Sequence, residues 1–385
     1  MRDTLLAFSP PRIGEEEINE VVQALRSDWI TAGPRTRQFE EEFSQFIGAD
    51  AALAVSSGTD AMLVGLAALG IQPGDEVITT PMTFCATAHV IEHLGARPVL
   101  VDVEPDTLNI DPSQIGAAIT PRTRAVLPVH LYGHPCEMGA VLDIAARYGL
   151  SVLEDAAHAL PAWYQGQMVG TLSTLTAFSF YATKNLTTGE GGMLTGGREL
   201  IKQARVWSLH GVSQGAYERH GAERSWYYEV VLPGFKCNMS DIQAALGLHQ
   251  LRKLPQFQQR RRQIVDRYNQ GLARHGELQL PTQRPGVEPA WYLYVVRLNL
   301  DRLTIDRARF IEELRARNIA TSVHFIPLHI HPYYRDRYGF KPQDYPVAYH
   351  SYQRLVSLPL NLRMTDSDVD DVLEAVADVI ARHRR

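Results

Sequence analysis

The sequence predicts an α/β protein with a parallel β-sheet covered by helices on both faces, followed by a smaller α+β domain. Short apolar runs alternate with helical segments through the first three-fifths of the chain, a rhythm typical of parallel sheets. Past Thr195 this alternation ends, and longer helices and an alternating strand follow. We therefore expect a large domain over residues 1–240, and a linking helix with a small domain over residues 241–385.

Length and composition indicate a globular protein. The chain has 385 residues, of which 45% are hydrophobic and 21% charged, values that exclude collagen, coiled coil and wholesale disorder. Its 38 basic and 43 acidic residues give a net charge of −5, so no global field attracts nucleic acid or an anionic membrane. We expect neither as a partner. No window is long and apolar enough to span a membrane, and the N-terminus lacks a signal-peptide pattern.

The cysteines indicate a reducing compartment. Cys85, Cys136 and Cys237 are odd in number and lack paired spacing, so they suggest neither a disulfide framework nor a zinc cluster. We expect a cytoplasmic protein in which Cys136 and Cys237 are buried structural thiols.

Two amphipathic helices open the chain and an alternation of strands and helices follows. Ile18, Val21, Val22 and Leu25 have helical spacing, and Phe39, Phe43 and Phe46 mark the second helix. The expected elements after these are, in order, a strand over 51–55, a helix from Asp60, a strand over 76–80, a helix after Thr83, a strand over 98–103, a helix from Asp111 and Pro112, a strand over 124–129, a helix over 138–148 and a strand over 151–153.

The remaining elements are longer. The pattern predicts a helix over 199–209 and a long helix from Ser240 towards Tyr268, interrupted near Pro255 because proline removes a helical hydrogen bond. An alternating strand over 291–300 and a helix over 307–317 come next. The final helix carries Val369, Val372, Leu373, Val376 and Val379 on one face.

Three features fall at the carboxyl ends of expected strands, where open α/β sheets bind ligands. Ser56, Ser57, Gly58 and Thr59 follow a strand and open a helix, so they can hold a phosphate at the positive end of the helix dipole. A plain helix cap explains the same residues, and the pattern alone leaves both readings open.

Asp155 and Lys184 are the other two features. Asp155 ends a strand and precedes small residues, which fits either a catalytic carboxylate or a helix cap. Lys184 follows a strand that contains Ser179, and alone it reads as a solvated surface charge. Together, a phosphate cradle, a carboxylate and a lysine match the needs of pyridoxal phosphate (PLP). Phe84 offers a face on which the cofactor ring can stack.

The chain resembles the DegT/DnrJ family of nucleotide-sugar aminotransferases over nearly its whole length. The matching stretches are residues 29–34, 56–59, 74–78, 83–84, 154–159, 178–180, 184 with 190–192, 238–241, 324–329 and 357–360. The resemblance implies the PLP-dependent transferase fold type I, with a mostly parallel seven-stranded sheet in the large domain.

The resemblance also implies roles for individual residues. Lys184 is similar to the lysine that forms the Schiff base with the cofactor, and Asp155 to the partner of the pyridinium nitrogen. Gly58, Thr59 and Ser179 match phosphate-binding positions, Phe84 matches the stacking aromatic, and His158 matches a residue beside the ring hydroxyl. Asn238 resembles a residue that reaches the phosphate of the neighbouring subunit, which implies a homodimer with shared active sites. Thr31, His324 and His329 are expected to contact substrate.

The implied reaction transfers an amino group from glutamate to a keto sugar linked to a nucleotide diphosphate, with pyridoxamine phosphate as the intermediate form of the cofactor. The amino-acid sequence of residues 155–159 and 324–334 is most similar to that of enzymes that aminate C4 of UDP-linked sugars, while C3-specific and dTDP-linked relatives differ little from these. Related sugar dehydratases carry histidine in place of the lysine, so Lys184 favours transamination. A regulator that binds PLP without turnover is the alternative from another class.

Two further segments invite interpretation. Residues 211–228 interleave Arg219, His220 and Arg224 with Trp226 and neighbouring tyrosines, which fits either a site for the nucleotide diphosphate or a mobile polar loop. The histidines at 324, 329 and 331 show no tetrahedral ligand set, so we expect no metal site there.

Overall fold

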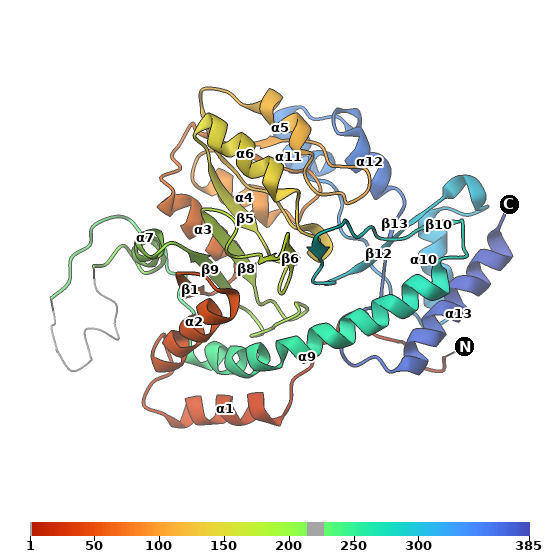
Figure 1. Ribbon diagram of the computed structural model, residues 1–385, viewed down its shortest axis with the longest axis horizontal. Helices are drawn as coiled ribbons and strands as arrows, with labels where there is room; N and C mark the ends of the chain where they lie inside the picture. The colour runs from red at the N-terminus through yellow and green to blue at the C-terminus, as the bar shows by residue number, and fades with distance from the viewer. Residues whose placement is uncertain (1, 214–226) are drawn as a thin grey trace.

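The computed structural model describes residues 2–213 and 227–385, and it confirms the predicted α/β architecture (Figure 1). A seven-stranded sheet with the order β1-β9-β8-β5-β4-β2-β3 lies at its centre. β9 is antiparallel to β1 and β8, whereas the other pairings are parallel. These strands are β1 (Ala51–Val55), β2 (Glu76–Thr79), β3 (Arg97–Leu100), β4 (Thr123–Val126), β5 (Ser151–Asp155), β8 (Leu175–Ser179) and β9 (Gly192–Gly196).

Helices cover both faces of this sheet (Figure 1). The helices that precede residue 213 are α1 (Glu15–Arg26), α2 (Pro34–Ile47), α3 (Gly58–Ala68), α4 (Ala86–His93), α5 (Pro112–Ala118), α6 (Met138–Tyr148) and α7 (Arg198–Ser208). Side chains of α3, α4 and α7 share one apolar core with the sheet. On the other face, Phe39 and Phe43 of α2 pack against Phe180 and Phe178, with ring centroids 5.4 and 5.2 Å apart. α5 and α6 cover the rest of that face.

The C-terminal third forms a second core. It contains the helices α9 (Asp241–Leu272), α10 (Arg307–Ala316), α11 (Pro332–Tyr338), α12 (Pro346–Tyr352) and α13 (Asp366–His383), and the strands β10 (Leu278–Gln279), β11 (Val287–Glu288), β12 (Tyr294–Leu298) and β13 (Leu355–Leu358). β10, β12 and β13 form an antiparallel sheet. α10, α13 and the end of α9 pack on this sheet around one apolar cluster. β11 instead pairs with β6 (Trp163–Tyr164), which pairs with β7 (Gln167–Met168).

Two sequence predictions about these elements are wrong in detail. α9 runs without a break through Pro255 for 32 residues, starting from a capping box between Ser240 and Gln243. The strand expected from residue 291 begins only at Tyr294, because Trp291 has a φ of 49°, a left-handed conformation that no strand residue adopts. The C-terminal helix is present, with Val369, Val372, Val376 and Val379 buried as expected and Leu373 half-buried.

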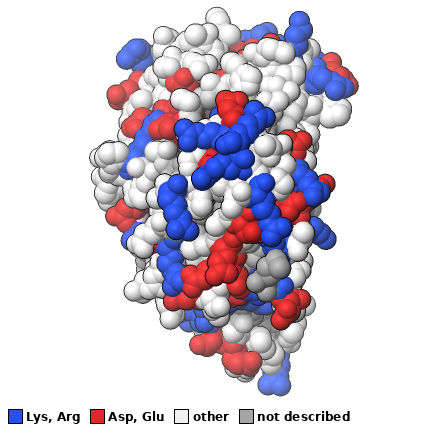
Figure 2. Space-filling model, turned by 90° about the vertical axis from the view of Figure 1, so that its right-hand side faces the viewer, with Lys and Arg blue, Asp and Glu red and all other residues white. Residues whose placement is uncertain are grey.

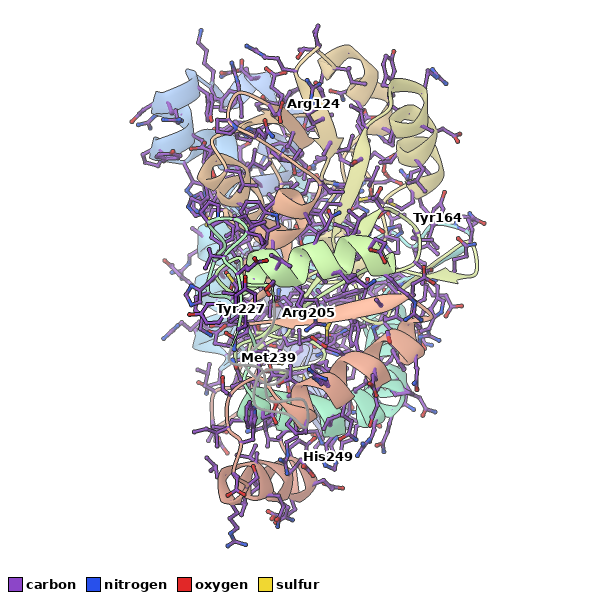
Figure 3. The ribbon with its side chains drawn as sticks, turned by 90° about the vertical axis from the view of Figure 1, so that its left-hand side faces the viewer. Arg124, Tyr164, Arg205, Tyr227, Met239 and His249 are labelled. Atoms are coloured by element: carbon purple, nitrogen blue, oxygen red, sulfur yellow. The ribbon has the colours of Figure 1, made fainter. Side chains whose placement is uncertain are left out.

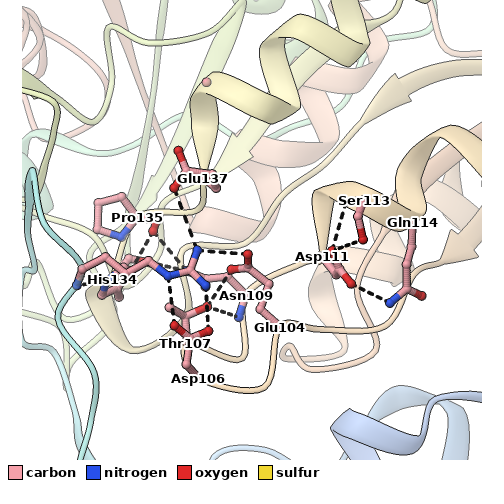
Figure 4. Close-up of polar contacts among 12 residues, drawn as sticks. Glu104, Asp106, Thr107, Asn109, Asp111, Ser113, Gln114, His134, Pro135 and Glu137 are labelled. Atoms are coloured by element: carbon pink, nitrogen blue, oxygen red, sulfur yellow. Dashed lines mark hydrogen bonds and ion pairs between the residues drawn. The ribbon is translucent and has the colours of Figure 1, made fainter.

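Polar contacts join the C-terminal third to the large sheet. Arg284, between β10 and β11, donates to Asp106 at 2.7 Å and to Glu104 at 2.9 Å. Figure 4 labels these two acidic residues in the loop after β3. Leu6 near the N-terminus forms a parallel bridge with Ile319. Both ends of the chain therefore contact the C-terminal core.

The face that carries α13 mixes charges of both signs (Figure 2). Arg317 pairs with Asp378 at 2.6 Å and Arg267 with Asp370 at 2.5 Å. No helix in the described ranges 2–213 and 227–385 is both long and apolar enough to cross a membrane.

Candidate active site

The predicted chemical groups gather at the carboxyl edge of the central sheet. Asp155 is the last residue of β5 and Ser179 the last residue of β8, while Gly58 opens α3 directly after β1. The pairing of Asp155 with Ala177, and of Ser179 with Gly192, places these strand ends side by side. We call Asp155, Ser179, Gly58 and Thr59 the strand-end set.

Asp155 is a buried carboxylate held by two donors. It is 5% exposed, accepts a hydrogen bond from the Thr87 hydroxyl at 2.8 Å, and accepts another from the Ala157 N–H at 3.1 Å. Burial raises the pKa of Asp155 above its ordinary value, while the two hydrogen bonds and the Lys184 ammonium oppose this rise. A cation placed opposite the carboxylate would also oppose this rise in the pKa of Asp155 and favour its charged form.

A short relay of hydroxyl groups supports Asp155. Thr83 precedes α4 and Thr87 lies in its first turn, and their hydroxyl oxygens are 2.7 Å from each other. Because the single hydroxyl proton of Thr87 is donated to Asp155, Thr83 must donate to Thr87. The sequence analysis singled out neither threonine for this role, although their spacing of four residues at a helix start was a signal for a shared face.

The N-terminus of α3 provides an anion cradle. Ser57 caps the helix by accepting from the Asp60 N–H at 3.0 Å, and the hydroxyls of Ser56 and Ser57 both donate to the Asp60 carboxylate. The first-turn N–H groups of Gly58 and Thr59 have no partner inside the helix and lie at the positive end of its dipole. A Cβ on Gly58 would lie 2.7 Å from the Cβ of Ser179, so only glycine allows these two elements to approach so closely. The segment thus forms a helix cap and presents two N–H groups that have no partner inside the helix.

Lys184 lies among aromatic side chains. Its Nζ is 4.5 Å from the centre of the Tyr292 ring, and this ring is 4.4 Å from that of His158. The ring of Phe325 lies 5.8 Å from His158 and 6.0 Å from Phe84. We call Phe84, His158, Tyr292 and Phe325 the aromatic set. Tyr292 and Phe325 were not among the predicted site residues, although Tyr292 belongs to an aromatic run in the strand predicted over 291–300.

His158 is a neutral hydrogen-bond donor. It is 7% exposed, and burial together with the nearby Lys184 and His324 holds its pKa well below the ordinary value. The backbone N–H of Tyr132 donates to its Nδ1 at 3.3 Å. Nδ1 is therefore the acceptor, and Nε2 carries the proton.

His324 borders the aromatic set. Its ring stacks on that of Phe8 at 5.6 Å, its Nδ1 lies 2.9 Å from the Ser357 hydroxyl, and its carbonyl accepts from the Tyr132 hydroxyl. Burial, with a smaller effect of Lys184, lowers the pKa of His324 to about 4. This imidazole is therefore neutral at pH 7.

His329 lies apart from these residues. It is fully buried against Tyr345 and Tyr349, with ring centroids 5.0 and 6.4 Å away. A direct contact with substrate would require this packing to open. In the described parts of the chain, no group of three or more His, Cys, Asp or Glu side chains is arranged to hold a metal ion.

Thr31 and Asn238 come together at a second place. Both line a hollow of about 690 Å³ between α2, α7 and the segment before α9, on the side of the molecule where Figure 3 labels Arg205 and Met239. Lys184 and Asp155 are not among the described residues that line it. Asn238 forms a bridge with Val55 on the open edge of β1, three strand spacings, or about 14 Å, from Ser179.

The loop suggested for the nucleotide lies largely outside the described residues. Arg219, His220, Arg224 and Trp226 all fall within 214–226. Tyr228 is described and lines the hollow beside Asn238.

The residues present fit PLP. The cradle at Gly58 and Thr59 suits its phosphate, and the buried Asp155 suits a protonated ring nitrogen. The Nε2–H of His158 suits an oxygen acceptor such as the ring hydroxyl, and Lys184 supplies the amine for the aldehyde. Phe84 is 58% exposed at the start of α4, so its ring face is free to stack on a flat ligand.

Comparisons with known proteins agree with this chemistry. A sequence model of the DegT/DnrJ/EryC1/StrS aminotransferase family matches residues 11–377. The chain is 51% identical to the spore coat polysaccharide biosynthesis protein SpsC of Bacillus subtilis over 381 residues, which cover 98% of each chain. It is 50% identical to the uncharacterized protein MJ1066 of Methanocaldococcus jannaschii over 385 residues, the full length of both.

A solved structure extends the likeness to the fold. Spr1654 from Streptococcus pneumoniae, provisionally assigned as a sugar aminotransferase, matches with a TM-score of 0.92 and 36% identity over 98% of this chain and 99% of that one. It has been solved with PLP and with pyridoxamine phosphate.

Proposed function

The chain belongs to the DegT/DnrJ/EryC1/StrS aminotransferase family and is a PLP-dependent sugar aminotransferase, and we propose that it transfers an amino group from glutamate to a nucleotide-diphosphate-linked keto sugar, at C4. The observation that carries the assignment of the site is the placement of Lys184, Asp155 and the cradle at Gly58 along one sheet edge.

Each residue of the site has a defined task. When bound, PLP provides an aldehyde that joins to an amine and a protonated ring that withdraws electrons. Lys184 would hold the cofactor through its amine, and this amine is the base that would move the proton of the donor Cα. Asp155 keeps the ring nitrogen protonated, and His158 donates its Nε2–H to the ring oxygen. Gly58, Thr59 and Ser179 bind the phosphate.

We assign Asn238 to the active site of a second copy of the chain. Asn238 lies about three strand spacings from Ser179 of its own chain, beside the edge strand β1 of the sheet. Val230 and Val231, which precede Asn238, are 67% and 58% exposed, which leaves apolar surface that a second chain could cover. The proposed enzyme is a homodimer with shared active sites in the cytoplasm, where Cys85, Cys136 and Cys237 remain free thiols.

We propose the C4 position because of the amino-acid sequence of residues 155–159 and 324–334. Lys184 disfavours dehydratase chemistry, because the related dehydratases carry histidine at this position. His324, at the edge of the aromatic set, and Thr31, in the hollow beside Asn238, are the residues we propose for substrate contact. His329 would contribute only after its buried packing opens.

A panel of UDP- and dTDP-linked keto sugars, assayed with glutamate, tests the proposal. We expect one 4-keto sugar to yield an amino sugar and 2-oxoglutarate, with the new nitrogen on C4 by NMR. Amination at C3, or turnover with another amino donor only, would overturn the respective assignment. A bound cofactor that glutamate leaves unchanged would favour a regulator without turnover.

A further inference from the structure

The ring of Tyr292 contacts both Lys184 and His158. Its ring centre is 4.5 Å from Lys184 Nζ and 4.4 Å from the centre of the His158 imidazole. Tyr292 is only 6% exposed. The lysine therefore rests on the face of a ring that is itself fixed by burial.

Hydrogen bonds hold this ring in place. The Tyr292 hydroxyl is 2.9 Å from the hydroxyl of Thr183, the residue before Lys184, and its backbone N–H donates to the carbonyl of Tyr132 at 3.1 Å. Tyr292 thus contacts two consecutive residues. The Tyr292 hydroxyl contacts Thr183, and the face of the Tyr292 ring contacts Lys184. It stands two residues before β12, so it reaches Lys184 from the segment that enters the C-terminal sheet.

Among residues 2–213 and 227–385, Lys184 makes no ion pair up to a nitrogen–oxygen distance of 4.0 Å, and Asp155 interacts with it only through longer-range electrostatics. This arrangement suits an amine that must release and accept a proton. A carboxylate at contact distance in a half-buried site would hold the ammonium strongly. An aromatic face attracts the cation more weakly than a contacting carboxylate would.

We infer that Tyr292 is a positioning residue that holds the Lys184 ammonium at the cofactor site through its ring face. This inference rests on the proposed role of Lys184 in carrying the cofactor. Lysine side chains have four rotatable bonds, so a weak but directional contact limits the positions of the amine considerably. The hydroxyl of Tyr292 orients the ring, and the ring contacts the lysine.

The test compares two variants of the apoprotein. Tyr292→Leu removes the ring, and Tyr292→Phe keeps the ring while losing the hydroxyl. The apoproteins are treated briefly with acetic anhydride at pH 8, and mass spectrometry follows acetylation of Lys184 relative to Lys202. Lys202 is an internal standard because its side chain is 70% exposed on α7.

We expect the Lys184 to Lys202 ratio to rise about 3- to 10-fold in Tyr292→Leu, the range that a partly buried cation–π contact implies. In Tyr292→Phe the ratio should stay within about twofold of wild type, because the ring face remains. An unchanged ratio in Tyr292→Leu, or an equal rise in both variants, would overturn the inference. If the leucine variant does not fold, Tyr292→Met replaces it, since methionine fills similar space without a ring.

A second readout separates this inference from the proposed function. Wild-type protein is loaded with PLP, reduced with borohydride and mapped for the modified lysine. Modification of Lys184 together with an unchanged acetylation ratio in Tyr292→Leu contradicts the role of Tyr292 alone. Modification of a different lysine contradicts the proposed role of Lys184 and the inference that depends on it.

Discussion

The strand-end set and the aromatic set meet at Lys184 but are built differently. Within the strand-end set, backbone pairing fixes Asp155 and Ser179 in register, and Gly58 and Thr59 open α3 directly against Ser179. The aromatic set draws on residues from Phe84 to Phe325, and ring packing across the two cores holds it together. The first set is therefore rigid by strand pairing, whereas the second depends on how the C-terminal core sits against the sheet.

This difference suggests a division of labour. The strand-end set binds the parts of the cofactor that stay fixed during the reaction, its phosphate and ring nitrogen. The aromatic set surrounds the lysine amine, which must move. Variants of the first set should therefore change the cofactor and its electronics, and variants of the second should change the lysine and the stability of the site.

The largest expected effect is that of Asp155→Asn. Turnover should fall about a thousandfold while PLP content stays near that of wild type, because a neutral amide no longer stabilises a protonated ring nitrogen. Kinetics and the visible spectrum of the bound cofactor measure this. Asp111→Asn, which changes only an exposed helix cap, is the control. Wild-type turnover in Asp155→Asn would contradict the proposed role of the Asp155 carboxylate.

Gly58→Ala should weaken cofactor binding by about 10-fold or more. Its Cβ would lie 2.7 Å from the Cβ and 3.1 Å from the Cα of Ser179, so the cradle must widen. Titration of the apoprotein with PLP gives the affinity. Gly116→Ala is the matched control, because an added Cβ there meets no atom within 4 Å. Equal PLP affinities of the two variants would show that the cradle is not rigid.

Thr87→Val should lower turnover about 10-fold. It removes one of the two donors to a buried carboxylate, and hydrogen bonds to charged groups contribute about 1.5–3 kcal/mol. The pKa of Asp155 should rise further, since the Thr87 hydroxyl lowers it in the wild type. Thr79→Val, which removes a buried hydroxyl bonded to the Leu127 carbonyl, controls for a loss of stability alone. A similar loss of turnover in both variants would contradict the relay.

The smallest effect concerns the pH dependence of stability on the aromatic side. The folded protein holds the pKa of His324 at about 4, below the value of about 6.5 for an unfolded chain. Between these values the unfolded state binds more protons, so His324 lowers the free energy of unfolding as the pH falls from about 6.5 to 4. His158 acts in the same direction, whereas the raised pKa of Asp155 acts in the opposite one.

Urea unfolding of apoprotein between pH 4.5 and 7 measures this dependence. The slope attributable to His324 is at most about 1.4 kcal/mol per pH unit, and His324→Gln should lose that share. A variant whose unfolding free energy falls as steeply as that of wild type would show that His324 is not held neutral by the fold.

The sequence predicted the strand-end set better than the aromatic set for a physical reason. Asp155, Ser179 and Gly58 follow strands, and parallel strands bring their carboxyl ends to one edge whatever the loops do. Tyr292 and Phe325 reach His158 only through the packing of the C-terminal core, which no local pattern encodes. The helix break predicted near Pro255 is absent for a related reason. Tertiary contacts along α9 outweigh the hydrogen bond that a proline removes.

The central claim is that Lys184 carries the cofactor opposite Asp155, and borohydride reduction of the PLP-loaded protein tests it most directly. The chain has five lysines, so a peptide map covers every candidate. We predict one reduced cofactor on Lys184 in the wild type, and no reduced cofactor and no visible absorbance band from covalently bound cofactor in Lys184→Ala. A stoichiometric adduct on Lys202, Lys236, Lys253 or Lys341 would contradict the account.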